Sequence, residues 1–219
     1  MNTKKIRIAL PTGSLKGRTL EILRNGGIDL SQKGRSYVLE GKNECSYEYM
    51  LVKPQEMPKF VERGFFDAGV SGMDWIRETA AEIRIFDSFP YSKRGWGSVR
   101  LVVAVSEGSL ITSVDDLEGR VIATEFVNLT KEYLKKNGIN ASVEFSWGAT
   151  ESKPSFFCDA VVDIVDSGES LAENRLRMID TLLESPVCLF TKKDADNGTI
   201  DSISPFFNAF LRGYKKSVL

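Results

Sequence analysis

The stretch "DIVDSGESLAENRL", residues 163 to 176, combines residue types that could hold a phosphate group. An apolar run ends at Val165, the chain turns at Gly168, and a helical pattern follows over 169–176. A buried strand followed by such a turn aims backbone N–H groups at a bound anion, and Gly168 permits close approach of the backbone. Asp166 and Glu169 flank this glycine, so the predicted anion site carries two negative charges of its own.

The same residues also match a helix start that needs no ligand. Asp166 or Ser167 as N-cap, with Glu169 or Ser170 three residues later, has the pattern of a capping box. The local pattern therefore leaves an anion site and a capped helix as alternatives.

Two other turns carry small or basic residues after an apolar strand. The turn in "PTGSLKGR" offers Thr12, Gly13, Ser14 and Lys16, and the turn in "FDAGVSGMDW" offers Gly69, Ser71 and Gly72. The first could contact an anion, and small residues in the second could let a ligand approach the backbone. Basic residues on a surface and glycines that only permit a turn are the alternatives.

The composition restricts the chemistry. The chain has 219 residues and a formal net charge of -1, so we expect no bulk attraction to nucleic acid or to an anionic membrane. It contains no histidine, which excludes Ser-His and Cys-His catalysis and His-ligated metal sites. Proton transfer must use carboxylates, water or the substrate.

The cysteines and the first residues indicate the compartment. Cys45, Cys158 and Cys188 are widely spaced and odd in number, which predicts reduced thiols rather than a disulfide framework. The apolar stretch near the start is too short for a signal peptide or a membrane span. We expect a cytoplasmic protein.

Strand and helix patterns alternate along the chain. Predicted strands cover 6–11, 47–53, 66–72, 98–105, 120–125, 141–148, 159–165 and 187–192. Predicted helices cover 14–25, 54–64, 73–78, 113–119, 128–138, 151–157, 169–176 and 202–219. The alternation favours an α/β fold with parallel sheets. We expect two lobes joined by a double crossover, residues 1–97 plus 188–219 and residues 98–187, with ligands in a cleft between them.

Taken in order, several stretches resemble the catalytic chain of the ATP phosphoribosyltransferase family. They are "RIALPTGSL", "LVKPQEMPKFVERGFFDAGVSGMDW", "RLVVAVSEGS", "VIATEFVNLTKEYL", "DAVVDIVDSGESLAENRL" and "LLESPVCLFTKK", which cover most of residues 6 to 193. The resemblance implies two lobes of periplasmic-binding-protein type II-like topology.

The family resemblance also implies an activity. The reaction moves phosphoribose from phosphoribosyl pyrophosphate to N1 of ATP, releases pyrophosphate, uses Mg2+ and begins histidine biosynthesis. Because the ribosyl centre becomes cationic as pyrophosphate leaves, positioning and charge stabilisation should dominate catalysis.

The resemblance places the phosphoribosyl pyrophosphate site in the second lobe and the nucleotide site in the first. It maps the family's phosphate loop onto Asp166, Ser167, Gly168, Glu169, Ser170 and Leu171. It maps the acidic strand residues onto Asp159 and Asp163, and an upstream glutamate that would face the ribose hydroxyls onto Glu151. Glu151 and Asp163 are thus the expected catalytic residues, and the two turns at 12–16 and 69–72 are the expected nucleotide contacts.

The length resembles the short family form, which implies partners. That form lacks a third, regulatory domain and is assembled with a separate subunit similar to histidyl-tRNA synthetase. We therefore expect a homo-oligomer, such a regulatory subunit, or both.

The chain departs from the family's pattern at the predicted phosphate site. The usual loop is Ser-Thr-Gly-x-Thr-Leu, and here acidic residues stand at 166 and 169. The family's lysine and arginine in the first turn are Thr12 and Ser14, and its glycine after the loop is Arg175.

At ~5 Å and an effective dielectric of ~20, one unit charge pair is worth roughly 3 kcal/mol. A nearby cation among Lys16, Arg18, Lys153 and Arg175, or a metal ion, must offset this, or the two acidic side chains must point away as caps. Otherwise the alternative holds, a catalytically degenerate paralogue that binds a nucleotide or another small ligand or serves as a regulatory subunit.

Overall fold

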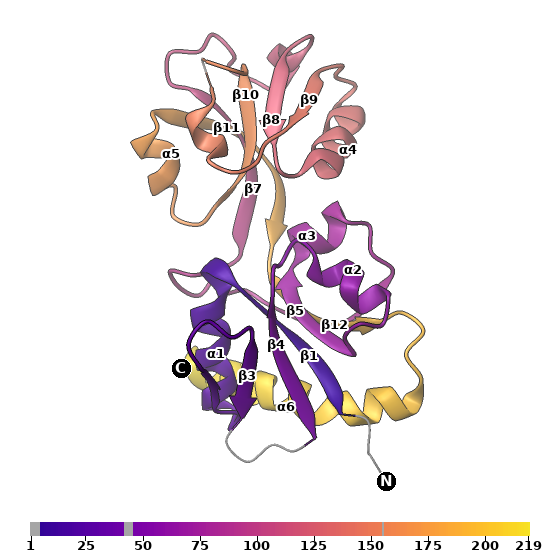
Figure 1. Ribbon diagram of the computed structural model, residues 1–219. Coiled ribbons are helices and arrows are strands. Elements are labelled where there is room, and N and C mark those ends of the chain that lie inside the picture. Colours follow the sequence, from indigo (N-terminus) through magenta and orange to yellow (C-terminus); the bar gives the residue numbers. More distant parts are fainter. Residues whose placement is uncertain (1–4, 42–45, 155) are drawn as a thin grey trace. The chain divides into compact units, whose positions relative to one another are not determined.

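The computed structural model describes residues 5–41, 46–154 and 156–219 and divides the chain into two compact units. Unit 1 comprises Met1–Gly97 and Pro186–Leu219, and unit 2 comprises Ser98–Ser185. The chain thus crosses from one unit to the other twice (Figure 1). The α/β fold predicted from the sequence is confirmed.

Unit 1 is a seven-stranded sheet in the order β2-β3-β4-β1-β5-β12-β6. Its strands are β1 (Ile6–Pro11), β2 (Leu30–Gln32), β3 (Val38–Gly41), β4 (Tyr47–Val52), β5 (Ala68–Gly72), β6 (Ile83–Phe89) and β12 (Val187–Lys192). Strand β1 runs parallel to β4 and β5, whereas β12 is antiparallel to both of its neighbours, β5 and β6. The parallel arrangement expected from the sequence holds for β4, β1 and β5, but the sheet is mixed, because β3 and β12 run antiparallel to this group.

Helices cover both faces of this sheet. They are α1 (Lys16–Asn25), α2 (Met57–Glu62), α3 (Met73–Glu78) and α6 (Asn197–Ser217), with a 3-10 turn η1 (Gly13–Leu15) before α1. Helices α1 and α6 pack together on one face, where Gly213 lies against the backbone of α1 and Phe206 and Phe210 fill the core. Helices α2 and α3 pack on the other face through Val61 and Ile76. Helix α6 begins five residues earlier than predicted, because Asp196 caps it by accepting a 2.7 Å hydrogen bond from the Thr199 N–H.

Unit 2 is a five-stranded sheet in the order β11-β7-β10-β8-β9. Its strands are β7 (Val99–Ser106), β8 (Val121–Thr124), β9 (Ser142–Phe145), β10 (Ala160–Val165) and β11 (Leu176–Ser185). Its helical segments are α4 (Val127–Asn137), α5 (Glu169–Glu173), η2 (Asp115–Leu117) and η3 (Thr150–Ser152). Strands β8, β9 and β10 are mutually parallel, and β7 is antiparallel to β10 and β11. The carboxyl ends of β8, β9 and β10 therefore share one edge, and the carboxyl end of β7 lies at the opposite edge.

Strand β11 is the main correction to the predicted elements. The helix expected over 169–176 ends at Glu173, and ten residues from Leu176 form a strand that the sequence pattern did not show. Two irregularities in its pairing with β7 disrupt the alternation of apolar and polar residues.

The two cysteines that the structure describes are not in a disulfide. Cys188 is buried, Cys158 is half-buried and both are free, while Cys45 lies outside the described residues. No helix in the described ranges is long and apolar enough to cross a membrane.

Candidate functional site

The glycine turn after β10 does not have the geometry of a capping box. Gly168 is itself the N-cap of α5, at φ +85°, and the Ser167 hydroxyl accepts a long hydrogen bond, 3.5 Å, from the Glu169 N–H. The alternative with Asp166 or Ser167 at the N-cap is therefore wrong. A left-handed backbone at this position favours glycine, which turns the chain sharply at the carboxyl end of the strand. Leu171 is buried and anchors the short helix.

The two acidic side chains of this turn are exposed to water. Asp166 and Glu169 are both exposed, as are Ser167 and Ser170. In an environment close to bulk water, a unit charge pair at ~5 Å is worth roughly 0.8 kcal/mol, about a quarter of its value at a dielectric of ~20. The electrostatic cost of holding a phosphate here is therefore much smaller than the sequence alone suggested.

A second segment at the same edge is joined to the turn by a hydrogen bond. The Ser170 hydroxyl donates to Glu151 Oε1 at 2.9 Å, and Glu151 belongs to η3, which follows β9. Within this segment Ser146 and Thr150 share a 2.8 Å hydrogen bond, and the Lys153 ammonium donates to the Ser146 hydroxyl. The expected ribose contact Glu151 and the expected phosphate loop are thus adjacent.

Asp163 lies on β10 behind this turn. Burial, with smaller contributions from the carboxylates of Glu151 and Glu125, raises the pKa of the Asp163 carboxyl to about 6. One of its oxygens, Oδ1, accepts a 2.7 Å hydrogen bond from the Ile164 N–H, which opposes the shift in pKa. Glu125, Glu151 and Asp163 together make this edge of the sheet strongly acidic.

Glu125 was missing from the residues singled out in the sequence. It follows Thr124, the last residue of β8, and β8 is the parallel neighbour of β10. The signal that could have identified it is its position, because a polar residue directly after a buried parallel strand lies at the edge where ligands bind.

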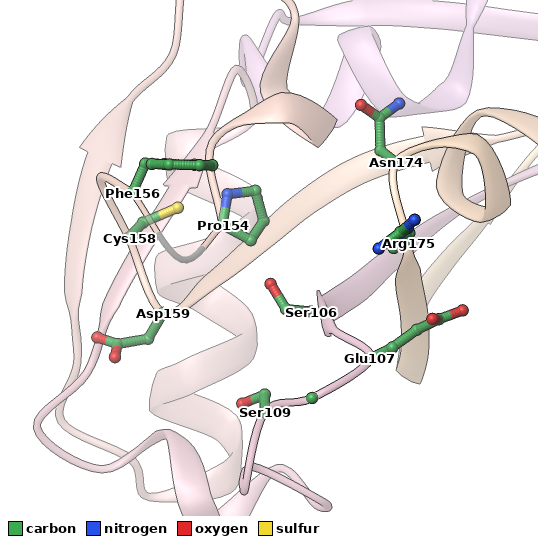
Figure 2. Close-up of a pocket in the computed structure, with 10 residues that line it drawn as sticks. Ser106, Glu107, Ser109, Pro154, Phe156, Cys158, Asp159, Asn174 and Arg175 are labelled. Atoms are coloured by element: carbon green, nitrogen blue, oxygen red, sulfur yellow. The ribbon is translucent and has the colours of Figure 1, made fainter.

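Asp159 is separated from this group. It precedes β10, four residues and about 13 Å along the strand from Asp163. Its Oδ2 accepts a 2.9 Å hydrogen bond from the Val121 N–H, and its Oδ1 lies 3.8 Å from the Arg120 guanidinium. The structure therefore brings Asp163, Glu151 and the glycine turn together, and places Asp159 at the opposite edge of the sheet, where it lines a pocket (Figure 2).

Arg175 does not lie beside the acidic turn. Its backbone carbonyl accepts a 2.9 Å hydrogen bond from the Glu107 N–H, which follows β7 at the same opposite edge, and it lines the pocket of Figure 2. Its φ of +52° explains why a glycine suits this position. The sequence offered two basic residues of unit 2, Lys153 and Arg175, to offset the charge of the acidic turn. Of these, Lys153 lies in the segment that is hydrogen-bonded to the turn through Glu151 and Ser170.

In unit 1, the first predicted turn follows β1. The Thr12 N–H donates to the Val52 carbonyl at 2.9 Å, which holds the turn beside the end of β4. Gly13, at φ +67°, and Ser14 are exposed, and the Lys16 ammonium donates to Gln32 Oε1. These groups are accessible at the carboxyl end of a parallel strand.

The second predicted turn of unit 1 is buried. A Cβ on Gly69 would lie 2.9 Å from the Phe190 ring, and one on Gly72 would lie 2.4 Å from Asp74 Oδ1. The Ser71 hydroxyl donates to the Pro54 carbonyl at 3.2 Å and is fully buried. All three residues have a packing role that accounts for their small size.

No group of three or more carboxylates or thiols in the described ranges is arranged to hold a metal ion by itself. Mg2+ usually keeps several waters and binds through one or two carboxylates together with substrate phosphates. Glu151 and Asp163, beside the glycine turn, fit that second arrangement.

Comparisons with known proteins agree on one family. The family model described as ATP phosphoribosyltransferase matches residues 53–210. ATP phosphoribosyltransferase of Chlorobium phaeobacteroides is 48% identical over 192 residues, which cover 88% of this chain and 65% of that protein. That of Solibacter usitatus is 44% identical over 188 residues, 86% of this chain and 65% of that protein. The chain thus spans about 65% of the length of these relatives.

Solved structures share the fold. The ATP phosphoribosyl transferase (HisG:HisZ) complex from Thermotoga maritima contains a chain that superposes with a TM-score of 0.79 at 21% identity, over 96% of this chain and 99% of that one. The periplasmic aliphatic sulphonate binding protein SsuA from Escherichia coli superposes with a TM-score of 0.59 at 14% identity, over 98% of this chain and 72% of that one. These matches confirm the periplasmic-binding-protein type II-like fold. The family model covers well over half of the chain, and the chain belongs to the ATP phosphoribosyltransferase family.

Proposed function

We propose that this protein transfers phosphoribose from phosphoribosyl pyrophosphate to N1 of ATP and releases pyrophosphate, the first step of histidine biosynthesis. The observation that carries the proposal is the hydrogen bond between Ser170 and Glu151, which joins a glycine turn suited to a phosphate with a carboxylate suited to ribose hydroxyls. Membership of the family supplies the reaction.

In this proposal the 5-phosphate binds to backbone N–H groups and hydroxyls of residues 167–170. Glu151 accepts hydrogen bonds from the ribose hydroxyls while it holds the turn through Ser170. Asp163 and Glu125 add negative charge at the same edge, which stabilises the ribosyl centre as it becomes cationic. None of these steps needs a histidine.

The leaving pyrophosphate needs positive charge, which Mg2+ supplies when bound. Glu151 and Asp163 would hold the ion together with the substrate's oxygens. With a pKa of about 6, Asp163 is mostly ionised at neutral pH and so can act as a ligand there. The proposed nucleotide contacts in unit 1 are Thr12, Gly13, Ser14 and Lys16. The buried strand β5, which contains Gly69, Ser71 and Gly72, is proposed to support the turn that carries these contacts.

We also propose that the protein works with other chains. The matching Thermotoga maritima structure is a complex of two components, HisG and HisZ. By analogy, the expected partner is a histidyl-tRNA-synthetase-like regulatory subunit, alone or with further copies of this chain. A cytoplasmic location fits this role.

The activity is tested by incubating the protein with ATP, phosphoribosyl pyrophosphate and Mg2+, with and without a candidate regulatory subunit. Phosphoribosyl-ATP is the expected product. If the folded protein yields no product in either mixture, the proposal is refuted.

The phosphate turn is tested separately by calorimetric titration with phosphoribosyl pyrophosphate. At roughly 0.8 kcal/mol per charge pair, each exposed carboxylate weakens binding of a dianionic phosphate by about 1.6 kcal/mol, roughly tenfold. The variant Asp166→Ser/Glu169→Thr should therefore bind about 100-fold more tightly. Glu173→Ser removes a carboxylate farther along the same helix and is the matched control. Equal affinity in the double variant and the control would place the 5-phosphate elsewhere.

A further inference from the structure

Unit 2 contains a pocket that the proposed transfer reaction does not use. Its volume is about 590 Å³, within the range of small-molecule sites, and residues after β7, before β10 and before β11 line it. It lies at the carboxyl end of β7, the edge of the sheet opposite the glycine turn at Gly168. A ligand here would therefore be distinct from the substrates of the transfer reaction.

One side of this pocket carries a cation whose backbone is fixed. Arg175 donates its N–H to the Ala172 carbonyl at 3.0 Å and accepts from the Glu107 N–H at 2.9 Å. These bonds hold it at φ +52°, a conformation that an arginine adopts rarely. Its exposed guanidinium has no hydrogen-bond or ion-pair partner among the described residues. Unfavourable backbone geometry that is held in place often marks a functional position.

A carboxylate stands next to this cation. The Glu107 side chain lies on the same side of the pocket as Arg175 (Figure 2). Across the described part of the chain, it too has no hydrogen-bond or ion-pair partner, and the two are not paired with each other. The other carboxylate of the pocket, Asp159, lies on the opposite side and is already held by the Val121 N–H and by Arg120.

The wall facing this charged pair is apolar. It is formed by Pro154, Phe156 and Cys158, and Figure 2 shows these side chains across the pocket from Arg175. The Phe156 side chain is 83% exposed, so a ligand could cover much of its apolar surface.

We propose that this pocket binds a small zwitterion of the α-amino-acid type. Its carboxylate pairs with Arg175, its ammonium pairs with Glu107, and its side chain packs against Pro154 and Phe156. The reason for a zwitterion is that Arg175 and Glu107, whose backbones are joined by a hydrogen bond, carry opposite charges on the same side of the pocket, as an α-amino acid carries two opposite charges close together. A simple anion would face repulsion from Glu107, and a simple cation would face repulsion from Arg175.

Three probes of similar size test the proposal by calorimetric titration, without ATP or phosphoribosyl pyrophosphate, so the outcome is independent of the transfer reaction. L-phenylalanine carries both charges, 3-phenylpropanoate lacks the ammonium and 2-phenylethylamine lacks the carboxylate. L-phenylalanine should bind at least tenfold more tightly than either analogue. Absence of saturable binding, or equal affinity for all three, overturns the proposal.

Two variants assign the charges. Arg175→Gly should remove the preference for L-phenylalanine over 2-phenylethylamine, and Glu107→Gln should remove its preference over 3-phenylpropanoate. Because glycine accepts the positive φ, Arg175→Gly should remain folded. Ala80→Gly is the matched control, since Ala80 also has a positive φ, +46°, but lies in unit 1. Unchanged preferences in the two pocket variants, or the same loss in the control, would overturn the assignment.

Discussion

Replacement of Asp163 by asparagine should stabilise the protein at neutral pH. Burial raises the pKa of the Asp163 carboxyl from 3.8 to about 6, a difference of roughly two units. At 1.36 kcal/mol per unit, its ionised form costs the folded state about 3 kcal/mol. Asparagine has nearly the same shape, and its oxygen can still accept the hydrogen bond from the Ile164 N–H, so the substitution removes the charge and keeps the contact.

The pH dependence gives the sign of the effect. Because the folded-state pKa is higher than the unfolded one, the folded state binds the proton more tightly. The stability that the bound proton on Asp163 gives the folded state is fully present below pH ~4 and is lost as the pH rises through 6. The difference in the free energy of unfolding between Asp163→Asn and the parent should therefore grow by about 2.5 kcal/mol, in favour of the variant, between pH 4 and pH 7.

Urea denaturation at intervals of half a pH unit measures this difference. Asp87→Asn is the matched control, because Asp87 also accepts a hydrogen bond from the N–H of the next residue, at 2.8 Å, but is exposed. A difference that does not vary with pH, or an Asp163→Asn variant less stable than the parent at pH 7, would refute the electrostatic account. Since Asp163 is also a proposed site residue, the stabilised variant should lose transferase activity, as expected where function keeps a charge buried.

Three further changes test the structure and the site. Gly213→Ala should destabilise the protein by more than ~3 kcal/mol in thermal or urea unfolding, because a Cβ would lie 1.8 Å from a carbonyl oxygen of α1. Gly17→Ala is the control: a Cβ there meets open space, so this variant should be neutral or stabilising. Hydrogen bonds from backbone N–H groups lower the pKa of Asp116 to about 2, so the stability that its carboxylate contributes above pH 3.8 is lost as the pH falls toward 2. Asp116→Asn should therefore make the free energy of unfolding fall less steeply below pH ~4. Ser170→Ala should weaken the binding of phosphoribosyl pyrophosphate, measured by calorimetry, with little change in unfolding temperature, because it releases Glu151 at an exposed position.

The sequence predicted the strands whose apolar residues form compact runs, and it failed for strands without such runs. Strands β1, β7, β10 and β12 are buried along most of their length and were all predicted. Strand β11 is half-buried, and its apolar residues Leu176, Ile179 and Leu183 recur at helical spacing instead of alternating. Two irregularities in its pairing with β7 accommodate this spacing in a strand. Short strands near the sheet edge, such as β2 and β3, bury too few residues to leave a pattern.

The candidate site was predictable in part for a related reason. A glycine after a buried strand indicates a turn, so the turn between β10 and α5 could be located from the sequence alone. The partner of a side chain depends on strand order and direction, which the local pattern does not contain. Glu125 therefore went unnoticed, and Asp159 was assigned to a site from which the length of β10 separates it.

The exposure of the acidic turn changes what its charges imply. A carboxylate in a dry site would exclude a phosphate, and Arg175 cannot neutralise one there, since it lies at the other edge of the sheet. Asp166 and Glu169 are exposed, so water screens most of their charge. Lys153 in the adjoining segment offsets part of the remainder. The balance predicts weaker phosphate binding rather than none, so under the proposed function the acidic loop should lower the affinity for phosphoribosyl pyrophosphate without abolishing the transfer reaction.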